Sequence, residues 1–261
     1  MHAIAHQRRD LVAERFAAAG GHQDQRIAAI DDDIDDLLTR DVYYDPAAVG
    51  NSSLAALGTL LRSTNLTLPD GPTGVGMLQV SVTTDFYNYI FEYNAGGTGE
   101  TNNSNSIGIA STISSYPDLQ VSGLVVNPSS GVQSGNQVTI VWNDSNTGFA
   151  ATSGAWYDHV QVANGAQSLL DTYVYYDPMV LGSGNVAVGG QHHQSLPLTL
   201  PNGPMGAGPI TVTVTTNAFH QLYEYNGSNS GFTNNTSTTS FNSALGPYPD
   251  LVVTSPAKPK P

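Results

Sequence analysis

The amino-acid sequence repeats itself without a gap at an offset of 132 residues, and this repeat constrains the fold more than any other feature. Residues 42–119 and 174–251 share 33 identities in 78 aligned positions. The segment Tyr116-Pro117-Asp118-Leu119, for example, returns as Tyr248-Pro249-Asp250-Leu251. Solenoid repeats have periods of roughly 20–50 residues, so a period this long corresponds to a whole domain. The sequence therefore predicts a piece of a tandem array of domains.

The pattern within each repeat indicates a β-domain. Val80–Thr84 and Ile210–Thr215 alternate apolar and polar residues, as half-buried strands of an antiparallel sheet do. Turn signals rich in Pro, Asn and Gly separate the strands. Further strands are predicted at Leu119–Val126, Gln137–Trp142, Trp156–Val162, Thr172–Tyr176, His193–Leu200, Leu222–Tyr225 and Ser237–Phe241. About seven or eight short strands in ~130 residues predict an immunoglobulin-like β-sandwich, with a jelly roll or a small barrel as alternatives.

The limits of the repeat predict the domain boundaries. Residues 116–247 form a complete repeat, residues 41–115 an incomplete one, and residues 248–261 the first strand of a further repeat followed by a Pro-rich tail. Residues 1–40 do not resemble the second copy, and a weak apolar stripe favours a helix over Arg9–Ala19. We therefore expect an all-β fold of tandem immunoglobulin-like antiparallel β-sandwiches, the first incomplete, preceded by a short helical or disordered segment.

Two interpretations of residues 1–40 compete. They are a genuine N-terminal extension, or they mark a gene start or a frame change inside a domain. The second is favoured because the junction falls in mid-domain. In either case these residues are in a position to cover the gap left in the first repeat.

Charge and composition exclude several classes of function. The net charge is -13, and no Lys or Arg lies between residues 63 and 257, against 11 Asp and Glu. Such a surface repels nucleic acids and anionic membranes. The absence of cysteine excludes disulfides and thiolate metal sites. The Asn-, Ser-, Thr- and Gly-rich body is typical of extracellular β-proteins. Residues 1–20 lack the apolar core of a secretory signal, so an export signal would lie outside this sequence, or the protein is cytosolic.

Several short motifs lie along the repeats. They are Tyr116-Pro117-Asp118-Leu119, Pro128, Gly135–Trp142, Asn146-Thr147-Gly148, Trp156-Tyr157-Asp158-His159-Val160, and the closing pattern of Asp85, Asn88, Glu92 and Asn102-Asn103. Together these motifs resemble the CARDB family, the "cell adhesion related domain found in bacteria", over about residues 41–251. The resemblance implies a surface protein of bacteria or archaea that is built from β-sandwich repeats, and it implies no catalysis.

The closing segment of each repeat is the leading candidate for a binding site. Its carboxylate and amide oxygens are the ligands that Ca²⁺ prefers, so calcium is the one cofactor that we predict. Alternatively, the Asn side chains serve only to satisfy loop backbone groups. The second copy replaces Asp85 by Asn217 and Asn88 by His220, which weakens the case for a shared ligand role. The candidate ligands are Asp85, Glu92, Asn94, Glu100, Asn102 and Asn103 in the first repeat and Glu224, Asn226, Asn234 and Asn235 in the second.

Aromatic residues offer a second candidate site. Neighbours on a strand point to opposite faces, so Tyr175 and Tyr176 should place one ring in the core and one outside. Trp142 and Trp156 are expected in the core of the sandwich. The rings on the outside could contact a carbohydrate. The candidate rings are Trp142, Trp156, Tyr157, Tyr173, Tyr175 and Tyr176.

These observations predict a structural module rather than an enzyme. No nucleophile elbow is present. We expect a spacer and adhesion module of a large exported bacterial surface protein, whose partners are neighbouring repeats and a cell-surface protein or glycan. The alternative is a carbohydrate-binding or calcium-dependent accessory module of a secreted hydrolase. Because the first repeat lacks early strands, we also expect open sheet edges and a homo-oligomer that borrows Tyr248–Thr254 from another chain.

Overall fold

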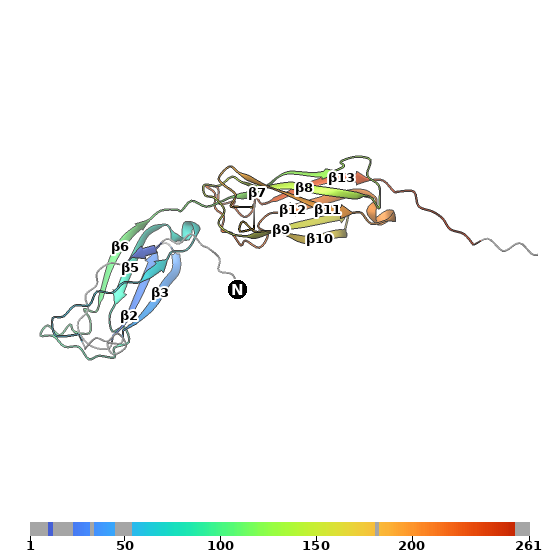
Figure 1. Ribbon diagram of the computed structural model, residues 1–261. Helices are drawn as coiled ribbons and strands as arrows, with labels where there is room; N and C mark the ends of the chain where they lie inside the picture. The colour runs from blue at the N-terminus through green and yellow to red at the C-terminus, as the bar shows by residue number, and fades with distance from the viewer. Residues whose placement is uncertain (1–9, 13–22, 32–33, 45–53, 181–182, 254–261) are drawn as a thin grey trace, which may run out of the picture. The chain divides into compact units, whose positions relative to one another are not determined.

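A computed structural model describes residues 10–12, 23–31, 34–44, 54–180 and 183–253 of the chain. Over these residues the secondary structure consists of β-strands and two short 3-10 helices, which confirms the all-β prediction. The chain divides into an N-terminal unit, Gln7–Ser114, and a C-terminal unit, which begins at Ser115 (Figure 1). Among the described residues, no helix is long and apolar enough to cross a membrane.

Two antiparallel sheets build the C-terminal unit. One sheet has the strand order β10-β9-β12-β13, and the other has the order β11-β8-β7. The strands are β7 (Leu119–Asn127), β8 (Gln137–Asn146), β9 (Trp156–Asn164), β10 (Gln167–Tyr176), β11 (Gln191–Thr199), β12 (Gly208–Thr215) and β13 (Thr236–Ser243). The antiparallel β-sandwich predicted from the sequence is thus confirmed for this unit.

The core of the C-terminal unit follows from alternation along its strands. Every second residue of β8 is buried, from Val138 through Ile140 and Trp142 to Asn146. β9 and β12 alternate in the same way. Burial of one such aliphatic side chain contributes roughly 1.5–3 kcal/mol, so this shared core is the main source of stability. The other core residues from these two strands are Val160, Val162, Ile210, Val212 and Val214.

A turn that precedes β5 (Gly76–Thr83) and β12 has the same geometry in both units. The 3-10 helices Gly71–Gly74 and Gly203–Gly206 each begin with a glycine at φ 71. Only glycine takes that left-handed conformation without strain. The repeat in the sequence is therefore also a repeat in backbone conformation.

The described residues of the N-terminal unit form two sheets. One has the strand order β3-β2-β5-β6, and the other pairs β1 with β4. The remaining strands are β1 (Asp10–Val12), β2 (Gln23–Asp31), β3 (Ile34–Tyr44), β4 (Asn65–Thr67) and β6 (Ser104–Ser111). The four-stranded sheet has the same order as the sheet β10-β9-β12-β13 of the C-terminal unit.

The register shows that β2 takes the place of β9. Gln23 lies opposite Tyr44, as Trp156 lies opposite Tyr176. The two tyrosines are equivalent in the 132-residue repeat, whereas Gln23 and Trp156 are 133 residues apart. The strand positions are therefore kept, although the segment from Gln23 to Tyr44 is one residue longer than its counterpart from Trp156 to Tyr176 and the amino-acid identity is lost.

This finding corrects the prediction for residues 1–40. Asp10–Val12 form a strand, so the helix predicted at Arg9–Ala19 is wrong there, and the rest of that range lies outside the described residues. Residues 23–31 and 34–40 lie in strands of the N-terminal sheet, so a domain boundary at residue 40 would cut β3. The physical reason is tertiary: β4 pairs with Asp10–Val12, and its backbone hydrogen bonds outweigh a weak helical preference, while the edge of β5 pairs with β2.

Two predicted strands are absent from the described structure. Leu222–Tyr225 alternates between buried and half-buried residues but forms no ladder, because side chains and the carbonyl of Pro117 satisfy its backbone amides. Residues 248–253 also lie outside any strand, and Leu251, Val252 and Val253 are exposed. Residues 254–261 lie outside the described residues.

Candidate functional site

The closing segment of each unit begins with the same strained turn. Asp85 and Asn88 have φ of 44 and 53, and their counterparts Asn217 and His220 have φ of 47 and 52. Asp, Asn and His tolerate this left-handed region better than most residues. The exchanges between the copies therefore preserve the backbone while they change the charge.

Glu224 is the centre of a buried clamp in the C-terminal unit. Its Oε1 accepts hydrogen bonds from Asn217 Nδ2 at 2.6 Å and from Asn235 Nδ2 at 2.8 Å. Its Oε2 accepts a hydrogen bond from the backbone amide of Leu119, the first residue of β7. Burial raises the pKa of Glu224 to about 7, even though these donors act in the opposite direction.

Asp118 is the centre of an adjoining clamp. Asn234 Nδ2 donates to its Oδ1 at 3.0 Å, and Asn226 Nδ2 donates to its Oδ2 at 3.2 Å. Thr147 also donates its hydroxyl to Oδ2 at 2.8 Å. The two clamps together fasten the closing segment to the segment that opens the unit, although the two are more than 100 residues apart in sequence.

The donors in these clamps fit a structural role better than a calcium site. Calcium takes six to eight oxygen ligands. Here the four asparagines turn amide N–H groups, not oxygens, toward the carboxylates of Glu224 and Asp118. The described residues also contain no cluster of three or more His, Asp and Glu side chains that could hold a metal ion. Calcium binding in this unit would require the amides to turn over, and it stays a prediction.

The predicted ligands of the N-terminal unit are spread over separate contacts. Asp85 accepts the backbone amides of Tyr89 and Ile90 at 2.9 and 3.0 Å. Glu100 accepts the amide of Glu92 at 2.7 Å. Burial raises the pKa of Glu92, and the carboxylates of Asp85 and Glu100 act in the same direction.

The amides of this set serve mainly the loop itself. Asn94 binds the backbone and the hydroxyl of Thr98, and the Asn102 amide bonds to the carbonyl of Thr98. Asn103 accepts the Thr84 amide through its carbonyl and bonds Glu92 through its side chain. Asp85, Glu92, Glu100 and Asn103 are therefore linked, whereas Asn94 and Asn102 stabilise the turn around Thr98.

A buried carboxyl pair in the C-terminal core was not predicted from the sequence. Asp158 accepts the indole N–H of Trp142 at 3.0 Å and that of Trp156 at 3.1 Å, one on each oxygen. Asp144 lies beside it and beside Thr216, but neither of its oxygens accepts a well-formed hydrogen bond. Burial, and then the charge of Asp158, raises the pKa of Asp144 well above its usual range. Burial also raises the pKa of Asp158, but the hydrogen bonds from the two indoles and from Asp144 lower it, so this arrangement favours the proton of the pair on Asp144.

The signal for this pair was present in the alternation of the strands. Asp144 occupies an inward position of β8, two residues after Trp142. Asp158 occupies an inward position of β9, between the inward residues Trp156 and Val160. Carboxyl groups at inward positions must be hydrogen-bonded or protonated. Reading those positions as core would have identified the pair.

A row of aromatic rings lies on the outer face of β9 and β10. Tyr175 is exposed while Tyr176 is buried, as the strand alternation predicts. Tyr157 packs on Tyr175 with centroids 4.7 Å apart, and Tyr173 stacks on Phe219 at 4.7 Å. The rings thus turn their faces toward one another. Trp142 and Trp156 are fully buried, so they do not belong to this surface.

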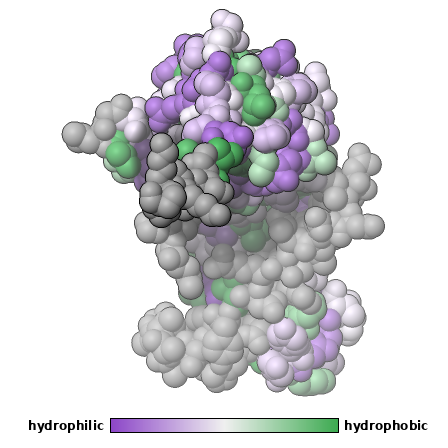
Figure 2. All heavy atoms as spheres, turned by 90° about the vertical axis from the view of Figure 1, so that its right-hand side faces the viewer, coloured by the Kyte–Doolittle hydropathy of each residue, from purple (hydrophilic) through white to green (hydrophobic). Residues whose placement is uncertain are grey.

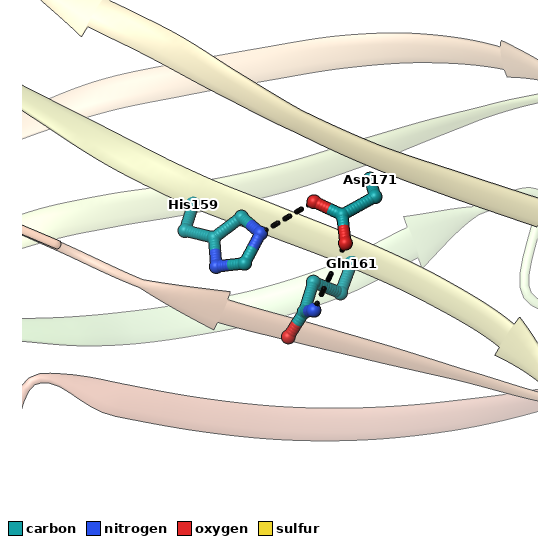
Figure 3. Close-up of polar contacts among 3 residues, drawn as sticks. All are labelled: His159, Gln161 and Asp171. Carbon is teal, nitrogen blue, oxygen red and sulfur yellow. Dashed lines mark hydrogen bonds and ion pairs between the residues drawn. The ribbon is translucent and has the colours of Figure 1, made fainter. Parts of the chain in front are cut away.

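Polar groups continue the aromatic row. His159 stacks on Tyr173, and its Nε2 lies 2.6 Å from Asp171 Oδ1. Gln161 Nε2 donates to the other Asp171 oxygen at 3.2 Å (Figure 3). The hydrogen bonds from His159 and Gln161 lower the pKa of Asp171. Hydrophilic residues predominate on the face of the molecule shown in Figure 2, and hydrophobic residues are scattered there.

Comparisons with known proteins give structural neighbours only. No family model and no curated protein sequence matches the chain. The CARDB domain of the PF1109 protein from Pyrococcus furiosus, solved in complex with di-metal ions, is 15% identical over 52% of this chain and 100% of that domain, with a TM-score of 0.34. CARDB is the family that the sequence motifs resemble.

Two further neighbours are parts of larger enzymes. The alkylpurine DNA glycosylase AlkC of Pseudomonas fluorescens is 12% identical, with a TM-score of 0.28 over 49% of this chain and 31% of that protein. Red sea bream transglutaminase is 11% identical, with a TM-score of 0.33 over 94% of this chain and 30% of that protein. At these identities and TM-scores, none of the three neighbours informs the function.

Proposed function

We propose that the chain is a spacer and adhesion module of a large exported surface protein, built from tandem β-sandwich repeats. The observation that carries this proposal is the use of the repeated polar residues. In the C-terminal unit, Glu224, Asn217 and Asn235 hold the closing segment to Leu119 rather than facing solvent. A repeat whose shared polar groups stabilise the framework favours a mechanical task over a chemical one.

The surface charge supports the same role. Residues 63–257 carry no Lys or Arg, and such an acidic surface keeps an extended array soluble and apart from nucleic acid. The motifs that resemble CARDB domains add the expectation of a cell-surface location. Neighbouring repeats of the same polypeptide and a surface protein or glycan are the partners that this role implies.

Immunolabelling of intact producing cells tests this proposal. An antibody raised against the C-terminal unit should label cells before lysis, and external protease should remove the label. Labelling only after lysis would contradict a surface role. Beads coated with the chain should then adhere to cells more strongly than beads coated with an unrelated acidic protein.

Carbohydrate binding is a second candidate, favoured by the aromatic row beside His159, Gln161 and Asp171. Because the rings stack on one another, a sugar would contact ring edges and the outermost faces only. Calorimetric titration with cell-wall polysaccharides, with Tyr175→Ala as the comparison variant, tests this candidate. Heats equal to dilution heats for every polysaccharide would end it.

A further inference from the structure

The C-terminal unit shows how a Tyr-Pro-Asp-Leu segment docks on its own closing segment. The Tyr116 ring packs on Tyr223 and Tyr225, with centroids 4.9 and 6.3 Å apart. The carbonyl of Pro117 accepts the amide of Tyr225 at 3.2 Å. Asp118 and Leu119 complete the attachment through the two clamps, and Leu119 is fully buried. The docked segment then continues directly as β7.

The N-terminal unit carries the residues that receive such a segment, but they are uncovered. Phe91, Glu92 and Tyr93 stand where Tyr223, Glu224 and Tyr225 stand in the second repeat. The side chains of Phe91 and Tyr93 are 86% and 80% exposed. Among the described residues of this unit, β1, β2 and β3 correspond to β8, β9 and β10, and none corresponds to β7. Over the part of this unit that the structure describes, the surface that would receive such a segment is therefore open.

The same chain carries a second segment of the docking sequence. Tyr248-Pro249-Asp250-Leu251 repeats Tyr116-Pro117-Asp118-Leu119 residue for residue. Leu251 is 91% exposed, in contrast to the buried Leu119. Tyr248 is held at its hydroxyl, which lies 2.8 Å from both Ser134 Oγ and the Gly203 amide. The apolar residues that follow it are thus presented to solvent by the C-terminal unit.

We propose that residues 248–253 of one copy dock as a strand on the N-terminal unit of a second copy, in the manner of Tyr116–Leu119. The Leu251 amide would donate to Glu92, as Leu119 donates to Glu224. The Asp250 carboxylate would accept from Asn94 and Asn102, the counterparts of Asn226 and Asn234. The Tyr248 ring would cover Phe91 and Tyr93. Strand addition of this kind supplies main-chain hydrogen bonds along with side-chain pockets.

The geometry of this contact is head-to-tail. The donor segment and the receiving surface belong to different units, so each contact leaves one donor and one surface free, and these either close into a ring of two or more copies or extend into a filament. The proposal does not depend on the surface role proposed above, and it concerns the chain as a purified protein.

Sedimentation velocity across a wide concentration range tests the proposal on the full chain. The unmodified chain should self-associate, and Leu251→Asp should weaken this association at least about tenfold, since a charge would replace a buried anchor. Leu251 is exposed in its own unit, so the substitution leaves that unit folded. Met179→Asp, which alters an equally exposed apolar side chain, should leave association unchanged.

A mixing experiment separates this contact from general stickiness. Tyr93→Ser should block the receiving surface, while Leu251→Asp blocks the donor strand. Each variant alone should stay monomeric, and the two together should form only a one-to-one heterodimer. A monomeric unmodified chain, or association that Leu251→Asp leaves intact, would overturn the proposal, as would a failure of the two variants to pair.

Discussion

Glu224 is a buried carboxyl group that three N–H donors surround. The side-chain amides of Asn217 and Asn235 and the backbone amide of Leu119 all donate to it. Burial favours the protonated form of Glu224, whereas these donors favour the ionised form, and the effect of burial is the larger.

The buried Glu224 should make the C-terminal unit less stable as pH rises. Its pKa is about 7 in the folded chain and near 4.5 when unfolded, so the folded state binds the proton more tightly. This contribution is complete below pH 4.5 and is lost as pH rises to 7, at a cost of up to about 3 kcal/mol. Urea unfolding followed by tryptophan fluorescence measures it, because Trp142 and Trp156 are the only tryptophans.

Glu224→Gln is the control for that pH dependence. Gln cannot titrate, so the fall in unfolding free energy between pH 4.5 and 7 should be smaller in the variant. The raised pKa of Asp144 adds a fall of the same sign, which the variant retains. Equal slopes for the unmodified chain and the variant would show that Glu224 does not titrate in this window.

The importance of Glu224 could be predicted from the sequence, but its role could not. The repeat marks Glu92 and Glu224 as equivalent, and their polar neighbours favour a ligand site. In the structure the nitrogens of Asn217 and Asn235 face Glu224, so the amides act as hydrogen-bond donors. Tertiary contacts orient these side chains, and a linear pattern does not contain that information.

The two carboxyls of the core pair should respond differently to the same substitution. Asp158 accepts both indole N–H groups, and Asp158→Asn would set an amide N–H against one of them, which costs about 2–4 kcal/mol. Asp144 is held in its protonated form, so Asp144→Asn should cost little and should reduce the pH dependence. Urea midpoints of the two variants at pH 5 decide this. A larger loss for Asp144→Asn would reverse the roles assigned to the pair.

At the scale of elements, alternation predicted the strands that pack on the core. Within Leu119–Phe241, short segments alternate between apolar and polar residues, and strands form at them. These strands are β7, β8, β9, β12 and β13. The pattern failed at Leu222–Tyr225. The alternation there reflects burial of Leu222 and Glu224, but the Leu222 amide bonds to the Asn217 side chain and the Tyr225 amide to the Pro117 carbonyl. It also missed β2, because the strand there is specified by its neighbours rather than by its own residues.

β2 should be essential to the N-terminal unit despite its unrelated sequence. It lies between β3 and β5, and Ala28 pairs with Thr39 on one side and Ser81 on the other. A proline in a central strand removes a ladder hydrogen bond and leaves its acceptor unpaired, so Ala28→Pro should destabilise the unit by at least about 1–3 kcal/mol. Hydrogen exchange of Gly76–Thr83 should accelerate, while tryptophan emission from the C-terminal unit stays unchanged.

Ala28→Ser serves as the matched variant, since it keeps the backbone amide and a small side chain. Exchange in Gly76–Thr83 should then stay close to that of the unmodified chain. If Ala28→Pro left these amides as protected as before, residues 23–31 would not be part of the sheet.

At the scale of the whole molecule, the repeat predicted two β-domains but placed the first boundary too late. A domain can keep its strand order while its sequence diverges, because backbone pairing tolerates many side chains. The identities between the two copies therefore begin only near Val42, whereas the four-stranded sheet already begins at Gln23. Sequence identity shows where the two copies are still alike, whereas strand pairing shows how far the domain extends.

The acidic surface and the calcium hypothesis concern different responses of the melting temperature, one to ionic strength and one to Ca²⁺ itself. Residues 63–257 contain acids without Lys or Arg, so sodium chloride should raise the Tm by screening repulsion, with a Debye length of about 8 Å at 0.15 M. Since amide N–H groups already meet Asp118 and Glu224, Ca²⁺ at constant ionic strength should leave the Tm unchanged, as should EDTA. Differential scanning calorimetry with Ca²⁺, Mg²⁺ and EDTA measures this. Asp85→Asn copies Asn217, its counterpart in the second repeat. A rise in Tm with Ca²⁺ that this substitution abolishes would instead place a calcium site in the N-terminal unit.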